Sequence, residues 1–113
     1  MKIIRIEELP GILPAKHYDL VSRRIADATI GAKAMGVSLV RLSRSGRADF
    51  HIHENAEQLF IVLKGEMAMK TEQEEVRLKP MEAAFISPGE RHRNFNVADG
   101  ETEYIVITGN LKP

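Results

Sequence analysis

The stretch HIHENAEQLFIVLKG, residues 51–65, carries the clearest indication of the fold, because it contains a strand with apolar residues at consecutive positions. Alternate residues of a strand point to opposite faces, so Phe60 and Val62 share one face and the odd-numbered residues 59–63 form the other. A strand that is apolar on both faces must be covered on both. The closing Gly65 suits a tight hairpin, since glycine accepts a positive φ without steric cost.

The second apolar face of this strand consists of Leu59, Ile61 and Leu63. In a small chain, such a face can be covered by a second subunit or by an N-terminal arm such as residues 3–13. We favour a homodimer that buries it. The arm contains Pro10 and Pro14, which lack the donors that a sheet interior needs, so we expect it to run as an extended segment before the main sheet.

Short apolar segments at strand-like spacing, separated by turn signals, recur along the rest of the chain, whereas the apolar spacing of a helix is scarce. The sequence therefore predicts an all-β fold. The expected strands are residues 3–7, 19–26, 35–42, 47–53, 58–63, 66–71, 74–78, 82–86, 92–97 and 102–108.

Composition restricts the classes of function. At 113 residues the chain fits a single domain. Its 16 basic and 16 acidic residues balance, which argues against nucleic acid or an acidic membrane surface as a partner. The absence of cysteine excludes a disulfide framework and a thiol nucleophile. No apolar run approaches the roughly 20 residues of a transmembrane span, and the charged start does not suit a signal peptide, so we expect a cytoplasmic protein.

Three of the four histidines fall in two short segments, His51-Ile52-His53 and the run that ends at His92. Residues two apart on a strand share a face, so His51 and His53 can direct both imidazoles into one cavity. Without cysteine, a metal site must use histidine, carboxylate and amide donors, and neutral imidazole is a common ligand of divalent transition metals. The fourth histidine, His17, lies in the proline-flanked arm, and we expect it to be structural or exposed.

The segment from Ser45 to Gly65 resembles the first motif of the cupin superfamily, G-x5-H-x-H-x3,4-E-x6-G. The run Ser87-Pro88-Gly89-Glu90-Arg91-His92-Arg93-Asn94-Phe95-Asn96 is similar to the second motif, G-x5-P-x-G-x2-H-x3-N. The resemblance covers residues 45–96 and implies a double-stranded β-helix, or jelly-roll, barrel. We expect residues 18–113 to form this barrel and residues 1–17 to form the arm and a first strand. The resemblance also implies one divalent transition-metal ion (Zn, Mn, Fe or Ni), held by His51, His53, His92 and residue 57 or 58.

The fourth ligand is the main departure from the family pattern. The spacing to Gly65 places Gln58 in the position of the motif glutamate, while Glu57 is one residue early. Strand parity favours Gln58, because it shares a face with Phe60, although a local bulge would favour Glu57. Small cupins with glutamine here include enzymes that open unsaturated uronate sugars. Three imidazoles and an amide leave the ion its full charge, which favours Lewis-acid chemistry over redox cycling. The other departures, at Ser45, Met81 and Ser87, concern turns.

Further residues are candidates for substrate contact or catalysis. Arg47 and Asp49 share the His51 parity, so they are candidates for an anion contact and a proton carrier at the barrel mouth. Asn94 shares the His92 face, and Phe60 shares the Gln58 face, which makes both candidates for substrate binding. Tyr104 is a candidate phenol donor, with core packing as the alternative.

Two classes of function remain open from the sequence. The first is a metal-dependent enzyme, resembling the isomerase, lyase or epimerase members of the family, that uses the ion as a Lewis acid on a small carboxylate or sugar-like metabolite. The second is a non-catalytic module that binds or senses a small molecule; a redox-active dioxygenase is a further alternative. We favour the enzyme, because 113 residues leave no room for a fused DNA-binding unit.

Overall fold

A computed structural model describes residues 1–111 of the chain. Strands account for most of these residues, and the helices are single 3-10 turns. The strands are β1 (His17–Ala26), β2 (Met35–Ala48), β3 (Ala56–Lys64), β4 (Met67–Thr71), β5 (Glu75–Leu78), β6 (Ala83–Ile86), β7 (His92–Asn96) and β8 (Thr102–Asn110), and the 3-10 turns are η1 (Ile6–Glu8) and η2 (Ala28–Ile30). None of the helices in residues 1–111 has the length or the apolar character that crossing a membrane requires.

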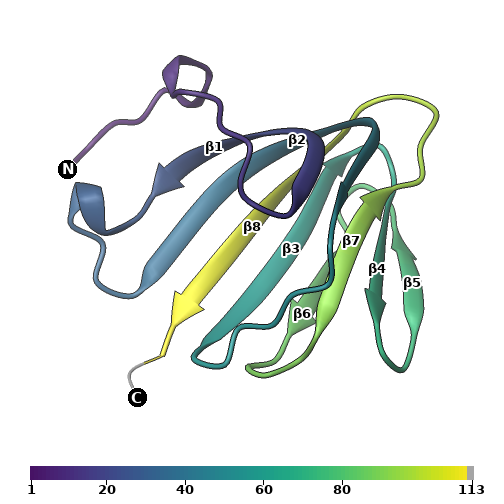
Figure 1. The fold of residues 1–113 in the computed structure, drawn as a ribbon. Coiled ribbons are helices and arrows are strands. Elements are labelled where there is room, and N and C mark those ends of the chain that lie inside the picture. The colour runs from purple at the N-terminus through teal and green to yellow at the C-terminus, as the bar shows by residue number, and fades with distance from the viewer. Residues whose placement is uncertain (112–113) are drawn as a thin grey trace.

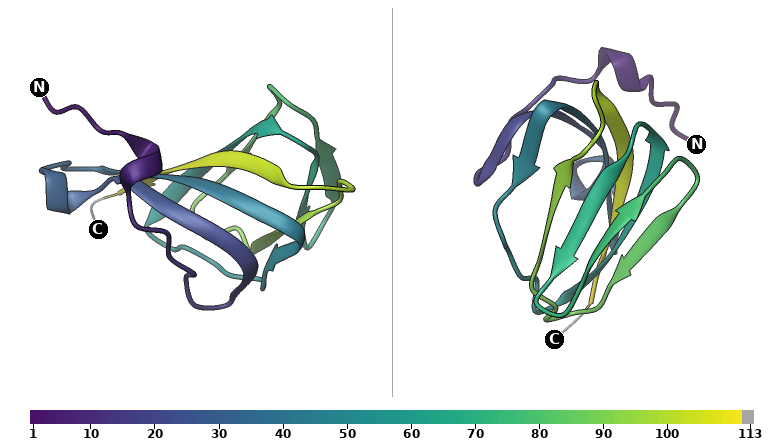
Figure 2. Two further views of the ribbon diagram at one scale, coloured as in Figure 1. Left: turned by 90° about the horizontal axis from the view of Figure 1, so that it is seen from above. Right: turned by 90° about the vertical axis from the view of Figure 1, so that its right-hand side faces the viewer.

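All the strands join one antiparallel sheet in the order β5-β4-β7-β2-β8-β3-β6, with β1 paired to β2. The 14-residue strand β2 connects the two halves of this sheet, because β1 pairs along most of one edge of β2, while its other edge pairs with β8 over residues 35–42 and with Phe95 of β7 at Arg47. The sheet therefore curls into a nearly closed barrel, shown in Figure 1 and from two further directions in Figure 2. The predicted all-β barrel is confirmed.

The interior of the barrel follows the alternation of the strands. Phe60 and Val62 of β3 are 3% and 0% exposed, whereas Leu59 and Ile61 on the opposite face are half-buried. Leu42 of β2 faces the same interior and is fully buried. The apolar core comprises Leu20, Val40, Leu42, Phe60, Val62, Met67, Met69, Leu78, Ile86 and Tyr104.

Two glycines, Gly65 of the first motif and Gly46 one position after Ser45, occupy positions where a side chain has no room. Gly65 joins β3 to β4 with a φ of 84°, and a Cβ there would clash with Thr102 Oγ1 and approach the Thr102 Cα to 2.8 Å. A Cβ on Gly46 would approach the Asp19 carbonyl oxygen to 2.7 Å. Met81, which stands where the second motif has glycine, adopts a φ of 70° without that freedom.

Two of the expected strands are wrong. Residues 3–7 form no strand, because the chain turns through η1 there, and pairing in the arm is limited to the bridge from Ile12 to Ser22 of β1. The expected strand 47–53 is also wrong, since β2 runs without a break from residue 35 and ends at Ala48. Beyond it, pairing is limited to one isolated bridge between His51 and His92.

The N-terminal arm covers part of the outer face of the sheet. Glu7 of η1 forms an ion pair with Arg41 of β2, and Arg41 also contacts Glu103 of β8 at 2.7 Å. Leu39, on this outer face of β2, is only 6% exposed. Further along the same outer face, Phe85 of β6 remains 58% exposed, so the outer face is covered more fully over β1 and β2 than over β3 and β6.

Candidate metal centre

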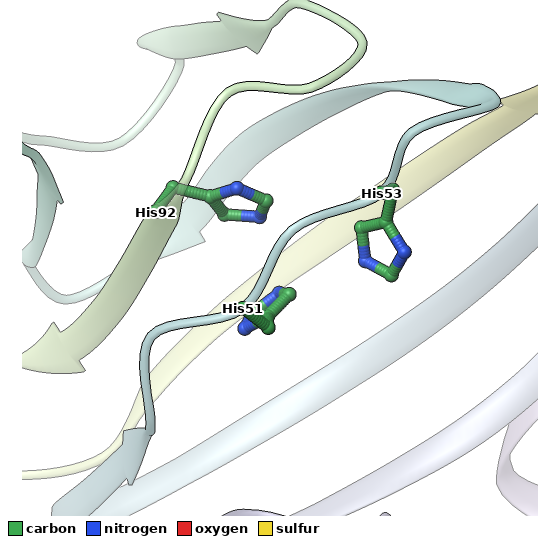
Figure 3. A group of neighbouring side chains, drawn as sticks. All are labelled: His51, His53 and His92. Carbon is green, nitrogen blue, oxygen red and sulfur yellow. The ribbon is translucent and has the colours of Figure 1, made fainter.

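Three imidazoles converge, with His92 buried, His51 half-buried and His53 exposed. His51 and His53 lie on the segment between β2 and β3, and His92 begins β7 (Figure 3). Paired backbone hydrogen bonds of 2.9 and 3.0 Å between His51 and His92 join the two segments. One ring nitrogen from each of the three histidines lies within 4.8 Å of the others. These residues could therefore hold a metal ion.

Backbone carbonyls fix the orientation of two of the rings. His51 Nδ1 donates to the Asp49 carbonyl at 2.9 Å, and His92 Nδ1 donates to the Glu90 carbonyl at the same distance. A proton on Nδ1 leaves the lone pair on Nε2, which is the tautomer that a metal ligand needs. His92 Nε2 is buried and has no hydrogen-bond partner among the described residues.

The environment of the rings favours the neutral form. Burial lowers the pKa of His51 from 6.5 to about 4, and the neighbouring histidines His92, His53 and His17 lower it further. Burial also lowers the pKa of His92. Both imidazoles are therefore neutral at pH 7 and available as ligands without a prior proton loss.

Gln58 points into the same interior from β3. It is 8% exposed, and its Nε2 donates to Thr108 Oγ1 at 3.1 Å. Its Oε1 is buried and has no partner among residues 1–111. Glu57 lies on the outer side of β3, where its Cγ is 3.4 Å from the point that a Cβ on Gly109 would occupy. An amide oxygen and three imidazole nitrogens form a donor set that fits a divalent transition metal.

A cavity of about 640 Å³ leads to this centre. Its walls come from β1, β2, β3 and β8, together with Asn94 of β7 and the loop around η2, and its residues include His51, His53 and Gln58. A volume of this size accommodates a small-molecule ligand. The apolar part of the wall includes Leu20, Val40, Phe60, Tyr104 and Val106.

The candidates for substrate contact separate into two groups. Phe60, Asn94 and Tyr104 line the cavity. Asn94 is 1% exposed, and burial raises the pKa of Tyr104 to about 12, so its phenol keeps its proton at neutral pH. Arg47 and Asp49 are not among the lining residues.

Arg47 and Asp49 lie outside the cavity wall because the strand that carries them ends early. The parity argument for Arg47 and Asp49 assumed a strand through residue 53, but β2 ends at Ala48. Arg47 instead lies over the Tyr18 ring, with 4.8 Å from its Cζ to the ring centroid, and 3.6 Å from Asp19. Asp49 accepts a hydrogen bond of 2.8 Å from the Tyr18 hydroxyl.

Two basic residues of β1, His17 and Arg24, line the cavity although the sequence did not single them out for the site. His17 lies beside the metal centre, with its ring centroid 5.8 Å from that of His51 and its Nδ1 donating to the Ala15 carbonyl. Arg24 lines the cavity seven positions further along β1. Neither belongs to a motif, and only the pairing of β1 with β2 brings them to this interior.

Comparisons with known proteins agree with this architecture. The family model described as Cupin domain matches residues 38–108, and no curated protein matches the sequence significantly. Similar solved structures include the polyketide cyclase RemF from Streptomyces resistomycificus, with 22% identity, a TM-score of 0.86 and coverage of 96% of this chain and 79% of that chain.

Two further structures show the same fold. A sugar phosphate isomerase from a cupin superfamily, from Silicibacter pomeroyi, has 21% identity and a TM-score of 0.83, with coverage of 96% of this chain and 76% of that chain. KdgF from Halomonas sp. has 16% identity and a TM-score of 0.79, with coverage of 99% and 96%. At these identities the similarity shows the fold and leaves the reaction open.

Proposed function

This chain belongs to the cupin family, whose model matches residues 38–108, and we propose that it is a metal-dependent enzyme acting on a small oxygenated metabolite. The proposed ligands of one divalent transition-metal ion are His51, His53, His92 and Gln58. The proposed substrate is a carboxylate or a sugar-like molecule that enters the cavity described above.

One observation carries the proposal: two buried acceptors near the same interior have no partner. His92 Nε2 and Gln58 Oε1 are both inaccessible and unbonded among the described residues. A buried polar atom without a partner costs roughly 1–3 kcal/mol, so the fold retains two such costs. A cation that accepts both lone pairs would remove these costs, which is the reason we assign the atoms to a metal.

The ligand set supports a particular class of chemistry. All four proposed ligands are neutral, so a bound divalent ion keeps its full charge and acts as a Lewis acid on a carbonyl, carboxylate or hydroxyl oxygen. Tyr104 and Asn94 offer polar atoms at the wall, and the protonated phenol of Tyr104 is a hydrogen-bond donor. Phe60 and Val106 provide apolar surface that excludes water from the reacting group.

Metal analysis tests the site. The purified protein should contain close to one transition-metal ion per chain, and His51→Ala or His92→Ala should abolish retention because an incomplete set of imidazoles remains. His17→Ala is the matched control, since His17 lies beside His51 and is not a proposed ligand. Full retention of the metal in the His51→Ala/His92→Ala double variant would refute the proposed centre.

Turnover distinguishes the enzyme from a binding module. The metal-loaded protein would be incubated with a panel of hydroxy acids, uronates and sugars and followed by NMR spectroscopy, with the metal-free protein as control. Consumption that depends on the metal supports the enzyme. Binding without any chemical change supports the non-catalytic module, and consumption that requires dioxygen supports the dioxygenase.

A further inference from the structure

The wall of the cavity is more basic than the chain as a whole. The protein carries 16 basic and 16 acidic residues. Among the described residues, the cavity wall contains the basic residues Lys16, Arg24 and Lys33 and the acidic residue Asp27. The wall therefore has a formal charge of +2 (three positive, one negative) when its histidines are neutral, in a protein of zero net charge.

This charge is divided between two ends of the cavity. Lys16 and His17 lie at the start of β1, beside the metal centre. Arg24 lies near the other end of β1, and Asp27 and Lys33 belong to the loop around η2. Residues 20 to 24 span roughly 13 Å of extended backbone, and β1 is irregular between Tyr18 and Leu20. A ligand that contacts both ends is therefore longer than a two-carbon acid.

The half-exposed guanidinium of Arg24 has two partners and still has donors to offer. Its Nε donates to Ser38 Oγ at 3.0 Å, and its Nη1 contacts Asp27 Oδ2 at 3.4 Å. Ser38 is 7% exposed, so one anchor of the guanidinium is buried. No hydrogen bond joins Nη2 to any other group in residues 1–111. A guanidinium that is oriented before binding loses less freedom for each bond it forms with an anion.

The charge at this end matches one carboxylate. Arg24 and Lys33 contribute two positive charges and Asp27 removes one, which leaves a net charge of +1. Asp27 is committed to its own loop, where its carboxylate accepts from Thr29 N and Thr29 Oγ1 at 2.9 and 2.6 Å. These bonds lower the pKa of Asp27, so its side chain stays ionised and its negative charge counts in this sum.

We propose that Arg24, assisted by Lys33, binds a terminal carboxylate of a ligand whose other end carries oxygen donors for the metal centre. This inference rests on the proposed function, because the metal defines the second point of attachment. It narrows the substrate class to elongated acids that carry an oxygenated group at one end and a carboxylate at the other. Arg24 is then a specificity-determining residue at a distance from the reacting atoms.

A length series of simple acids tests this subsite. The dissociation constants of succinate, adipate, suberate and sebacate would be measured by calorimetry on the metal-loaded protein. Each dicarboxylate would be compared with butyrate, hexanoate, octanoate or decanoate, the monocarboxylate of the same length. At the length that spans the cavity, the dicarboxylate should bind about tenfold tighter, because it adds a charge-assisted contact.

Variants assign that preference to Arg24. Arg24→Gln should reduce the preference to within about twofold, while Arg44→Gln, which changes an exposed arginine outside the cavity wall, should retain it. Lys33→Gln provides a second variant, because Lys33 is exposed and makes no side-chain hydrogen bond to the other described residues. This substitution should lower the preference for the dicarboxylate two- to threefold, which is roughly the effect of one exposed charge.

Acetate separates the two possible failures. It reaches only the metal, so its affinity should be the same in Arg24→Gln and in the wild type. If acetate binds the metal-loaded protein and no dicarboxylate is preferred at any length, the subsite is refuted and the metal centre stands. If acetate binds equally with and without metal, the proposed function itself fails. A preference that survives in both Arg24→Gln and Lys33→Gln also overturns the assignment.

Discussion

Replacing Gln58 by methionine should weaken the metal centre without destabilising the metal-free protein. Methionine keeps the unbranched length of the side chain and removes its amide. In the folded chain, Oε1 of Gln58 is buried without a partner, while Nε2 bonds Thr108. The substitution therefore removes one unfavourable group and one favourable contact.

These two effects give the expected magnitude. Relief of the unsatisfied carbonyl should stabilise the fold by roughly 1–3 kcal/mol, and loss of the hydrogen bond should cost about 1 kcal/mol. Thr108 is half-buried, so water can replace that bond. The metal-free variant should be more stable than the wild type by about 0–2 kcal/mol, which corresponds to a rise in melting temperature of up to roughly 8 °C. Metal affinity should fall at least about tenfold.

Thermal unfolding after treatment with a chelator, together with a competitive metal titration, measures both quantities. Glu57→Met is the matched control: it removes a carboxylate from the neighbouring residue on the outer side of β3, so metal affinity should stay within about twofold of the wild type. A Gln58→Met protein that loses more than about 2 kcal/mol of stability and binds metal normally would refute the reasoning. Loss of metal in Glu57→Met alone would identify the carboxylate as the ligand and restore the case for redox chemistry.

Three further outcomes are expected. Because burial raises the pKa of Tyr104 from 10.0 to about 12, the unfolded chain ionises first as pH rises through this range. The wild type should then lose up to about 3 kcal/mol more stability than Tyr104→Phe, and equal losses by alkaline unfolding would contradict this. Gly65→Ala should cost more than about 2 kcal/mol in urea unfolding, while Gly100→Ala, with no atom within 4 Å of the new Cβ, should cost less than about 0.5 kcal/mol. A homodimer should form through the β3–β6 outer face, so Phe85→Arg should give a monomer by light scattering and Val76→Arg should not; a dimer in both would exclude this interface.

The sequence alone determined the features that depend on short-range spacing. His51 and His53 are two residues apart, and both line the cavity as their spacing predicted, although the segment that carries them is not a continuous strand. Strand parity correctly predicted that Gln58 shares the buried face with Phe60 and Val62, because alternation within β3 needs no knowledge of its neighbours. The glycine of the hairpin at residue 65 follows from backbone sterics in the same way.

Only the tertiary structure decided which distant segments share the cavity. Parity failed for Arg47 and Asp49, because β2 ends at Ala48 and no strand continues through residues 49–53. Arg24 and His17 gave no signal in the sequence, since their position depends on the register between β1 and β2, which pairs Arg24 with Ser38. Register is set by contacts over the whole sheet, so a residue outside any motif reaches the cavity through pairing that local periodicity does not encode.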